Sequence, residues 1–432
     1  VRPLLAGIFR RQVGKKARPD HYPAPYSLIT LWKQHADNER AMMHAEAESV
    51  AELVTGPAAQ NLIRVFLLQE QLKALGRQSE FEVRRVHVIG AGVMGGDIAA
   101  WCAAKGLQVT LEDQSPERIA PAIKRAYGLF RRRFKRTRPV QEAMDRLMPD
   151  HTGLGVARAD VVIEAIFEDA DAKRALYARL EPRMKDGARL ATNTSSIPLQ
   201  ELRTGLVRPE CLIGLHFFNP VAKMQLVEIV RDAETGPDVV ARAIAFARLI
   251  DRLPLPVSST PGFLVNRILL PYLLEAVELE NEGVPPVEID RAAVDFGMPM
   301  GPIELADTVG LDICLHVGDI LAQHLGGEVP QRLRDLVSKG SLGRKSGQGF
   351  YRYRKGKPVK PLARKDYRPA ADITDRMVLR MLNEVVTCLR EKVVDDAGHL
   401  DAGMVFGTGF APFRGGPLHY ICLLYTSPSP RD

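Results

Sequence analysis

The chain has 432 residues, 46% of them hydrophobic, which is enough for two or three domains with sizeable cores. Its 59 lysines and arginines against 52 acidic residues give a net charge of +7, which suits small polyanions; no motif that reads nucleic acid occurs. No apolar run approaches the ~20 residues of a membrane span. The five cysteines show no metal-ligand spacing, so we expect reduced cysteines, no metal site and a cytoplasmic protein.

Residues 1–82 precede the first predicted strand and divide into two segments. The opening segment, residues 1–36, has no acidic residue before Asp20, a composition typical of an organelle transit peptide. Residues 37–82 carry apolar residues at three-to-four spacing with a break at Gly56-Pro57, which predicts a helical linker.

Residues 83–260 have a different sequence pattern, in which short β-rich runs alternate with longer helical patterns. The runs are RRVHVI, LQVTLE, ADVVIEAI, ARLAT, CLIGLH and LPLPV. This alternation predicts an α/β domain with a Rossmann-like, doubly wound parallel sheet. Strand patterns then disappear, so residues 261–354 are predicted to form an all-α domain.

The C-terminal part contains a duplicated helical unit. A linker at 355–372 that is rich in lysine and proline precedes a second helical repeat at 373–421. Within it, residues 375–417 repeat the pattern of 266–302, with Asp375 in the place of Asn266. Duplicated units commonly pack around a shared core. We expect only the first copy to serve chemistry, because the second lacks the amide.

The last segment, residues 422–432, reads CLLYTSPSPRD and resembles the translation of a sequencing-library adapter. This segment is predicted to be a sequencing-adapter scar outside the fold, and the second helical repeat is expected to be truncated.

A glycine-rich turn lies between the first predicted strand and the helix that follows. Gly90, Gly92 and Gly95 have GxGxxG spacing. Gly90 would make the tight turn, Gly92 would let the backbone approach a pyrophosphate, and Gly95 would let helix and strand pack closely. The first amides of the helix, at Val93 and Met94, would then face the phosphates. The alternative is an ordinary strand–turn–helix.

An acidic residue, Asp113, closes the next predicted strand and would accept hydrogen bonds from the adenosine ribose. Gln114 follows it, and no arginine stands there to hold a 2′-phosphate. The motif therefore predicts NAD as the cofactor in preference to NADP.

Polar residues follow three later strands, at the edge where parallel sheets bind ligands. They are Glu164, expected on the nicotinamide side, Ser195 in TNTSS, and His216. Removing hydride from a secondary alcohol requires loss of the hydroxyl proton, which a neutral imidazole can accept. A carboxylate on the other ring nitrogen would fix the tautomer, and Glu228 is the candidate.

Each of these residues also has a structural interpretation. A histidine that closes a strand is more often structural, Ser195 could cap the next helix, and Asn219 before a proline could serve only a turn. An unpaired Glu228 in a buried strand would be costly, which favours a paired role. Their joint occurrence after a dinucleotide motif favours catalysis.

At this point the chain resembles the L-3-hydroxyacyl-CoA dehydrogenases. The resemblance covers residues 83–355 and rests on NTSS, GLHFFNPV, LVEIV, PGFLVNR and GMPMGPIELAD, in that order. Residues 375–421 resemble the second helical repeat of bacterial multifunctional fatty-acid oxidation proteins. The HYPAPYSLI stretch is similar to their interdomain segment, so residues 1–36 are predicted to be the remnant of a hydratase-domain tail and its linker rather than a transit peptide.

The resemblance implies a role for each site residue. His216 would be the base and Glu228 its partner, while Ser195 and Asn266 would contact the oxygenated carbons of the substrate. The resemblance also implies that three further residues contact or line the cofactor site: Glu164, Asn219 (cofactor or substrate) and Lys345 in GRKSGQGFY. Asp169 stands where the family often has an amide.

The phosphates of coenzyme A would suit a basic patch. Residues 123–136, IKRAYGLFRRRFKR, offer Arg132 and Arg133 on a predicted helix, although a solvated charged face explains the same pattern. We expect an acyl-CoA substrate and, by the resemblance, a thiolase subunit as a possible partner in a β-oxidation complex.

The sequence therefore predicts NAD-dependent oxidation of (S)-3-hydroxyacyl-CoA to 3-oxoacyl-CoA. Two alternatives stay open. The first is a dehydrogenase of free hydroxy acids or sugar acids with a similar two-domain plan, which a substrate screen without coenzyme A would detect. The second is a non-catalytic scaffold, against which the intact set of site residues argues.

Overall fold

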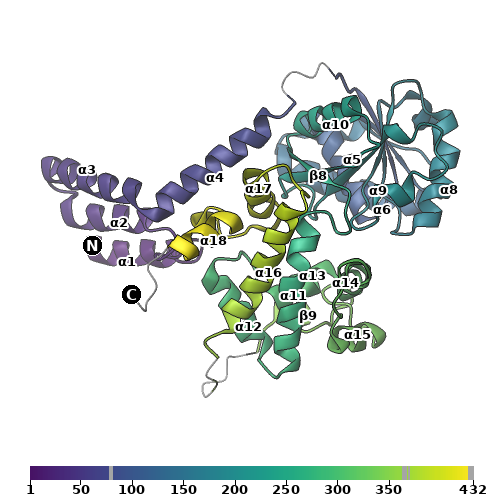
Figure 1. The fold of residues 1–432 in the computed structure, drawn as a ribbon. Helices are drawn as coiled ribbons and strands as arrows, with labels where there is room; N and C mark the ends of the chain where they lie inside the picture. The colour runs from purple at the N-terminus through teal and green to yellow at the C-terminus, as the bar shows by residue number, and fades with distance from the viewer. Residues whose placement is uncertain (77–80, 362–366, 368–369, 427–432) are drawn as a thin grey trace.

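The computed structural model describes residues 1–76, 81–361, 367 and 370–426. Four helices open the chain, and Figure 1 shows the last of them running from the first three towards the sheet. Asn38 caps the third helix, since its side-chain oxygen accepts a hydrogen bond from the N–H of Ala41 at 3.0 Å. The helices are α1 (Arg2–Val13), α2 (Ala24–His35), α3 (Glu39–Thr55) and α4 (Pro57–Ala74).

An eight-stranded sheet follows, with the order β3-β2-β1-β4-β5-β6-β7-β8. All neighbours are parallel except β6 and β7, which are antiparallel. The strands are almost wholly buried, as expected when helices cover both faces. They are β1 (Arg85–Ile89), β2 (Gln108–Glu112), β3 (Leu147–Pro149), β4 (Val161–Glu164), β5 (Arg189–Thr192), β6 (Leu212–Phe217), β7 (Leu226–Arg231) and β8 (Leu253–Ser258).

Helices lie on both faces of this sheet, so the predicted Rossmann-like architecture is confirmed. One face packs against α5 (Val93–Ala104), α6 (Pro116–Phe134), α7 (Thr137–Asp145) and α10 (Pro237–Leu249). The other packs against α8 (Ala170–Leu180), α9 (Leu199–Leu202), part of α4 and the helical domain. The second face therefore shares one core with the helical domain.

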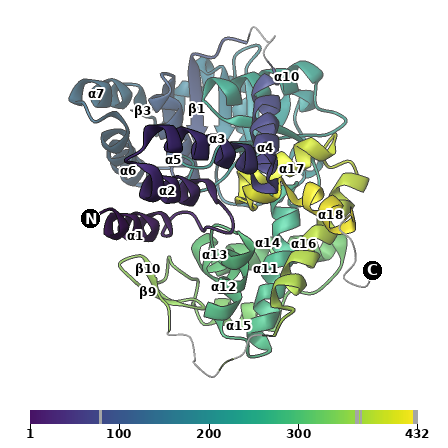
Figure 2. The same cartoon turned by 90° about the vertical axis from the view of Figure 1, so that its left-hand side faces the viewer.

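The helical domain lies beside the sheet domain in both views (Figures 1 and 2). It consists of α11 (Val265–Asn281), α12 (Pro286–Phe296), α13 (Pro302–Val309), α14 (Leu311–Leu325) and α15 (Gln331–Ser338). A small hairpin of β9 (Arg352–Arg354) and β10 (Lys357–Val359) follows. The second strand of this hairpin, β10, lies inside residues 355–372, the segment predicted to be a linker. The first part of that segment therefore pairs with β9.

The second helical unit consists of α16 (Ile373–Arg390), α17 (Ala397–Thr408) and α18 (Pro417–Thr426), and α16 lies along α11. Two reciprocal ion pairs join these helices. Arg267 of α11 pairs with Glu384 of α16 at 2.6 Å, and Arg376 of α16 pairs with Glu275 of α11 at 2.7 Å. In the duplicated pattern Arg376 stands where Arg267 does and Glu384 where Glu275 does, so the two copies face each other around an approximate two-fold axis.

The N-terminal helices contact this second unit. The side-chain nitrogen of Asn61, on α4, donates to the carbonyl of Phe413 at 2.8 Å, and its side-chain oxygen accepts from Nε2 of His419 at the same distance. Arg64 pairs with the fully buried Asp401 at 2.8 Å. Within the part of the chain that the structure describes, no helix combines the length and apolarity needed to cross a bilayer.

Candidate active site

The candidate site lies where β1, β4, β5 and β6 end, because these parallel strands share one carboxyl edge. The glycine-rich turn follows β1, and the TNTSS segment starts at the end of β5. His216 is the penultimate residue of β6. The topology thus brings the predicted cofactor turn and the predicted base to the same edge of one sheet.

The three glycines of the turn are glycines for different reasons. Gly90 has φ of 99°, and a Cβ there would lie 2.5 Å from the carbonyl oxygen of Ala165. A Cβ on Gly95 would lie 1.9 Å from the carbonyl oxygen of Gly90. A Cβ on Gly92 would meet nothing within 4 Å, and its φ of −59° is open to any residue. The fold requires Gly90 and Gly95, whereas Gly92 only keeps space in front of the turn.

The start of α5 fits a dinucleotide diphosphate. The helix begins at Val93, directly after Gly92, and no side chain caps its first amides. Free N–H groups at a helix start attract anions, and the open space at Gly92 lets a diphosphate reach them. Asp113, at the end of β2, accepts hydrogen bonds from the N–H groups of Ala91 and Gln114, both at 2.7 Å. These bonds fix the carboxylate beside the turn.

The predicted base and its partner are in contact. His216 and Glu228 stand opposite each other in the antiparallel register of β6 and β7. The Nδ1 of His216 lies 2.6 Å from Oε2 of Glu228. The other oxygen of Glu228 accepts from the N–H groups of Leu264 and Val265 at 3.1 and 2.9 Å, at the start of α11. The carboxylate, fully buried, therefore ties the imidazole to the helical domain.

The orientation of the imidazole follows from these contacts. With a carboxylate accepting at Nδ1, the neutral ring carries its proton there and Nε2 becomes the basic nitrogen. Among the residues that the structure describes, Nε2 has no hydrogen-bond partner. The rings of Phe218 and Phe263 lie 4.6 and 5.6 Å from the imidazole by centroid. Only 5% of the histidine is exposed.

Ser195 and Asn266 meet where the two domains join. The amide nitrogen of Asn266, in the first turn of α11, donates to the carbonyl oxygen of Ser195 at 3.1 Å. Both residues are half-buried. The sequence prediction that they share one site therefore agrees with their contact.

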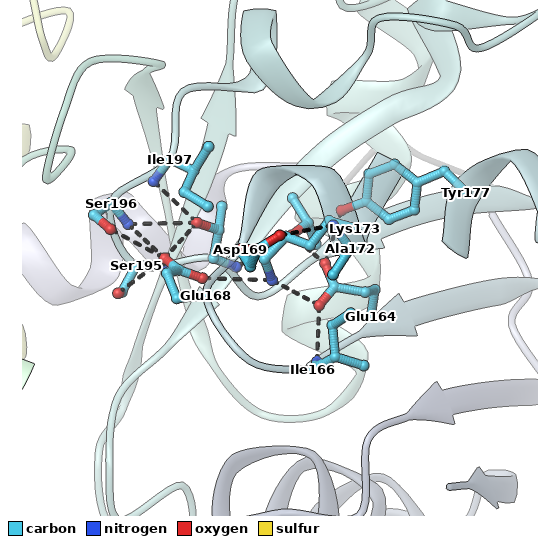
Figure 3. A network of polar contacts seen from close by, with 12 residues as sticks. Glu164, Ile166, Glu168, Asp169, Ala172, Lys173, Tyr177, Ser195, Ser196 and Ile197 are labelled. Carbon is cyan, nitrogen blue, oxygen red and sulfur yellow. Dashed lines mark hydrogen bonds and ion pairs between the residues drawn. The ribbon is translucent and has the colours of Figure 1, made fainter. Parts of the chain in front are cut away.

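Glu168 is a residue of this site that the sequence prediction missed. One of its oxygens, Oε1, accepts hydrogen bonds from five donors, which come from the TNTSS segment (Figure 3). Burial raises the pKa of Glu168, but the charge of Lys173 and the donors of Thr194, Ser195 and Ser196 outweigh it and lower the pKa overall. The donors are Thr194 Oγ1 (2.6 Å), Ser195 N (2.8 Å), Ser195 Oγ (3.2 Å), and Ser196 N and Oγ (both 3.1 Å).

Glu164 lies deep in the sheet domain. Its side chain is fully buried and accepts from Lys173 and Tyr177 at 2.7 Å each, as Figure 3 shows, and also from Thr192 at 2.7 Å. Burial and the charge of Glu164 raise the pKa of Tyr177 well above its ordinary value. The side chain of Glu164 anchors Lys173, which also lies 3.4 Å from Glu168, and its place on the nicotinamide side of the site stays a prediction.

The remaining predicted residues are spread around the site. Asn219 is exposed in the loop after β6. Lys345 is exposed and pairs with Asp312 at 2.6 Å. The loop that carries Lys345 is held by the buried carboxylate of Asp307. This carboxylate accepts hydrogen bonds from the N–H groups of Phe350 and Tyr351 at 3.0 and 2.9 Å. Asp169 caps α8 by accepting from Ala172 at 2.8 Å, a structural role for that departure from the family pattern.

Arg132 and Arg133 lie in the last turn of α6, whose first residue follows Asp113 closely. At 1.5 Å per residue, Arg132 and Arg133 lie about 25 Å along the helix axis from its first residue, Pro116. The guanidinium of Arg133 lies over the ring of Trp101, 4.8 Å from its centroid. The predicted contact of Arg132 and Arg133 with the phosphates of coenzyme A stays a prediction. Among the described residues, no cluster of potential ligands suits a metal ion.

Comparisons with known proteins agree with this arrangement. Residues 85–260 match the family description "3-hydroxyacyl-CoA dehydrogenase, NAD binding domain", and residues 262–353 match its C-terminal domain. Fatty acid oxidation complex subunit alpha of Shewanella baltica is 37% identical over an alignment of 436 positions, which covers 95% of this chain and 61% of that protein. The Pseudomonas putida protein of the same name is 36% identical, with 95% and 61% covered. The chain thus spans about three-fifths of these relatives.

Two solved structures are also similar. The 3-hydroxybutyryl-CoA dehydrogenase of Escherichia coli has a TM-score of 0.70 at 28% identity and covers 80% of this chain and 92% of its own. The (S)-3-hydroxybutyryl-CoA dehydrogenase of Ralstonia eutropha has a TM-score of 0.60 at 34% identity, with 63% of this chain and all of its own covered.

Proposed function

Because the chain belongs to the 3-hydroxyacyl-CoA dehydrogenase family, we propose that it oxidises (S)-3-hydroxyacyl-CoA to 3-oxoacyl-CoA in fatty-acid β-oxidation. The cofactor is NAD, as the glycine-rich turn predicted. NAD supplies the acceptor for the hydride that leaves C3 of the substrate. The protein's own task is to hold the two molecules together and to remove the hydroxyl proton.

The observation that carries the proposal is the buried contact between His216 and Glu228. Nε2 of His216 takes the hydroxyl proton of the substrate, and Glu228 stabilises the imidazolium that results. Since Glu228 is also bonded to the first turn of α11, the base keeps one orientation relative to the helical domain. A positioned general base contributes roughly 10²–10⁴-fold to the rate.

Ser195 and Asn266 are proposed to contact the oxygen atoms of the substrate. Ser195 lies in the turn after β5, beside the strand that carries His216, and Asn266 comes from the helical domain. Their mutual hydrogen bond already holds them together. Glu168 would fix the main chain and hydroxyl of Ser195, so it would act through that residue.

The cofactor site is proposed at the turn after β1. The amides of Val93 and Met94 would receive the diphosphate in front of Gly92, and Asp113 would receive the adenosine ribose. Its bonds to two main-chain N–H groups hold the carboxylate in place. Asn219 and Lys345 are proposed to reach the cofactor from the β6 loop and from the helical domain.

We further propose a cytoplasmic protein that works in a complex. The relatives in Shewanella and Pseudomonas carry the name of a complex subunit, which supports work in a complex; the partner proposed from the sequence resemblance is a thiolase subunit. Cys102, Cys211, Cys314 and Cys388 form no disulfide among the described residues, which supports a reducing compartment.

The proposal is tested by following NADH absorbance when the purified chain, NAD and (S)-3-hydroxybutyryl-CoA are mixed, with a long-chain substrate in parallel. We expect NADH to form with the coenzyme A thioesters and not with free 3-hydroxybutyrate. Oxidation of the free acid at equal or greater rate would favour the alternative of a free hydroxy-acid dehydrogenase. No oxidation of any substrate would contradict the proposed function.

A further inference from the structure

An arginine outside the glycine-rich motif reaches the cofactor turn from the neighbouring helix. Nη2 of Arg125, on α6, donates to the carbonyl oxygen of Gly92 at 2.7 Å. Its Nε lies 3.5 Å from Oδ1 of Asp97, on the second turn of α5. The guanidinium therefore lies on the first turns of the helix at whose start the diphosphate is expected.

A fourth glycine makes this position possible. A Cβ on Gly96 would lie 2.8 Å from Nη2 of Arg125 and 2.7 Å from the Cβ of Ala122. Neither distance is tolerated between real atoms, so α5 and α6 approach each other here only because Gly96 has no side chain. Gly96 is not part of the GxGxxG motif, and the contact with Arg125 gives it a separate purpose.

The acidic partner of Arg125 stands close to the expected anion. Asp97 follows Gly92 by five residues, which is about 7 Å along a helix axis. Its side chain is 30% exposed; burial raises its pKa, and Arg125 opposes that shift. The charged groups that bear on Asp97 are Arg125 and Arg132, and both come from α6. A bare carboxylate here would repel a diphosphate at the helix start.

We propose that Arg125 is a positioning residue for NAD that neutralises Asp97 and holds the Gly92 carbonyl, so that the turn keeps its attraction for the diphosphate. The inference rests on the proposed placement of the diphosphate at this turn. It requires no contact between the guanidinium and the cofactor, because the effect is transmitted through Asp97.

A double-mutant cycle on the full chain tests this, with dissociation constants for NADH from its fluorescence and for ADP-ribose from calorimetry. We expect Arg125→Gln to weaken both ligands roughly tenfold. Asp97→Asn should leave binding at least as tight as in the unmodified chain, because it removes the negative charge and keeps Arg125, and the double variant should return to within about threefold of the unmodified chain. Arg138→Gln removes the same charge from an arginine that is 90% exposed on α7, and should change neither constant.

A pH series separates charge compensation from simple support of the turn. In Arg125→Gln, protonation of Asp97 removes the uncompensated charge, so NADH affinity should recover as the pH falls. The NADH affinity of the unmodified chain and of the double variant should change much less over the same pH range. Unchanged affinity in Arg125→Gln, or a double variant as weak as Arg125→Gln, would overturn the inference. If the unmodified chain itself does not bind NADH, the proposed function fails as well. If the unmodified chain binds NADH and only the effect of Arg125→Gln is missing, the inference about Arg125 fails alone.

Discussion

Glu168 accepts both the main-chain N–H and the hydroxyl of Ser195, at 2.8 and 3.2 Å, through a single carboxylate oxygen. The proposed substrate contact is therefore held by a residue from the neighbouring strand's loop. Because the same oxygen also serves Thr194 and Ser196, the entire turn after β5 depends on one charge. The predictions below begin with that charge.

Replacing Glu168 by glutamine should lower kcat/KM roughly tenfold or more and destabilise the fold by about 1–3 kcal/mol. The amide keeps the shape but loses the charge that Lys173 and several donors share. Steady-state kinetics and urea unfolding measure the two effects. Glu201→Gln, at an exposed position on α9, is the matched control and should change neither. Wild-type kinetics in Glu168→Gln would contradict a role in holding Ser195.

The stabilisation from Glu168 should depend on pH. Its pKa in the folded chain lies below the ordinary value of 4.5, so the unfolded chain binds the proton more readily. The contribution is therefore fully present well above pH 4.5 and is lost as the pH falls through the lowered pKa. The difference in unfolding free energy between the unmodified chain and Glu168→Gln, measured from neutral pH downward, should shrink in that acidic range. A difference that grows on acidification would contradict this sign.

Replacing His216 by glutamine should lower turnover by roughly 10²–10⁴-fold and leave NADH affinity nearly unchanged, because the ring serves as base and not as a cofactor contact. Rates with (S)-3-hydroxybutyryl-CoA and NADH fluorescence titrations measure both. His151→Gln, at an exposed histidine, is the control and should behave like the unmodified chain. Near-normal turnover in His216→Gln would remove the imidazole from the mechanism.

Two glycines of the turn should respond in opposite ways to alanine. Gly92→Ala adds a Cβ that meets no protein atom, so stability should change by less than about 1 kcal/mol while NADH affinity falls about tenfold or more. Gly95→Ala places a Cβ against the carbonyl of Gly90 and should destabilise by more than about 2 kcal/mol. Thermal melts with and without NADH distinguish them. Full NADH affinity in Gly92→Ala would mean that the diphosphate lies elsewhere.

The reciprocal ion pairs between α11 and α16 should be unequal in strength. Arg267 is 2% exposed and also pairs with Glu391 at 2.8 Å, so Arg267→Met should cost about 2–4 kcal/mol. Arg376 is 32% exposed, and its partner Glu275 keeps Arg380 at 3.3 Å, so Arg376→Met should cost less than about 1 kcal/mol. Urea unfolding of both variants gives the comparison, and equal costs would contradict the reasoning from burial.

Much of the arrangement follows from local sequence patterns. The alternation of strands and helices is a local property, and so is the glycine spacing, which is why the sheet and the turn after β1 could be predicted. The pairing of His216 with Glu228 could be anticipated because an isolated carboxylate in a buried strand is costly.

Other features depend on contacts that no local pattern contains. The sequence IEAIFEDAD offers several acids after β4, and only the packing of α8 shows that Glu164 points inward to Tyr177 while Glu168 points to Ser195. Arg125 belonged to a basic run that resembled a solvated face. Its placement at Gly92 depends on how closely α6 approaches α5.

The approximate two-fold axis between α11 and α16 lies within a single polypeptide. The two helical units that it relates therefore need not have the same sequence. In an assembly of equal copies, any substitution at such an axis occurs twice. Here Asn266 can stay under selection for the reaction while its counterpart Asp375 drifts, so one half can specialise in chemistry and the other in support.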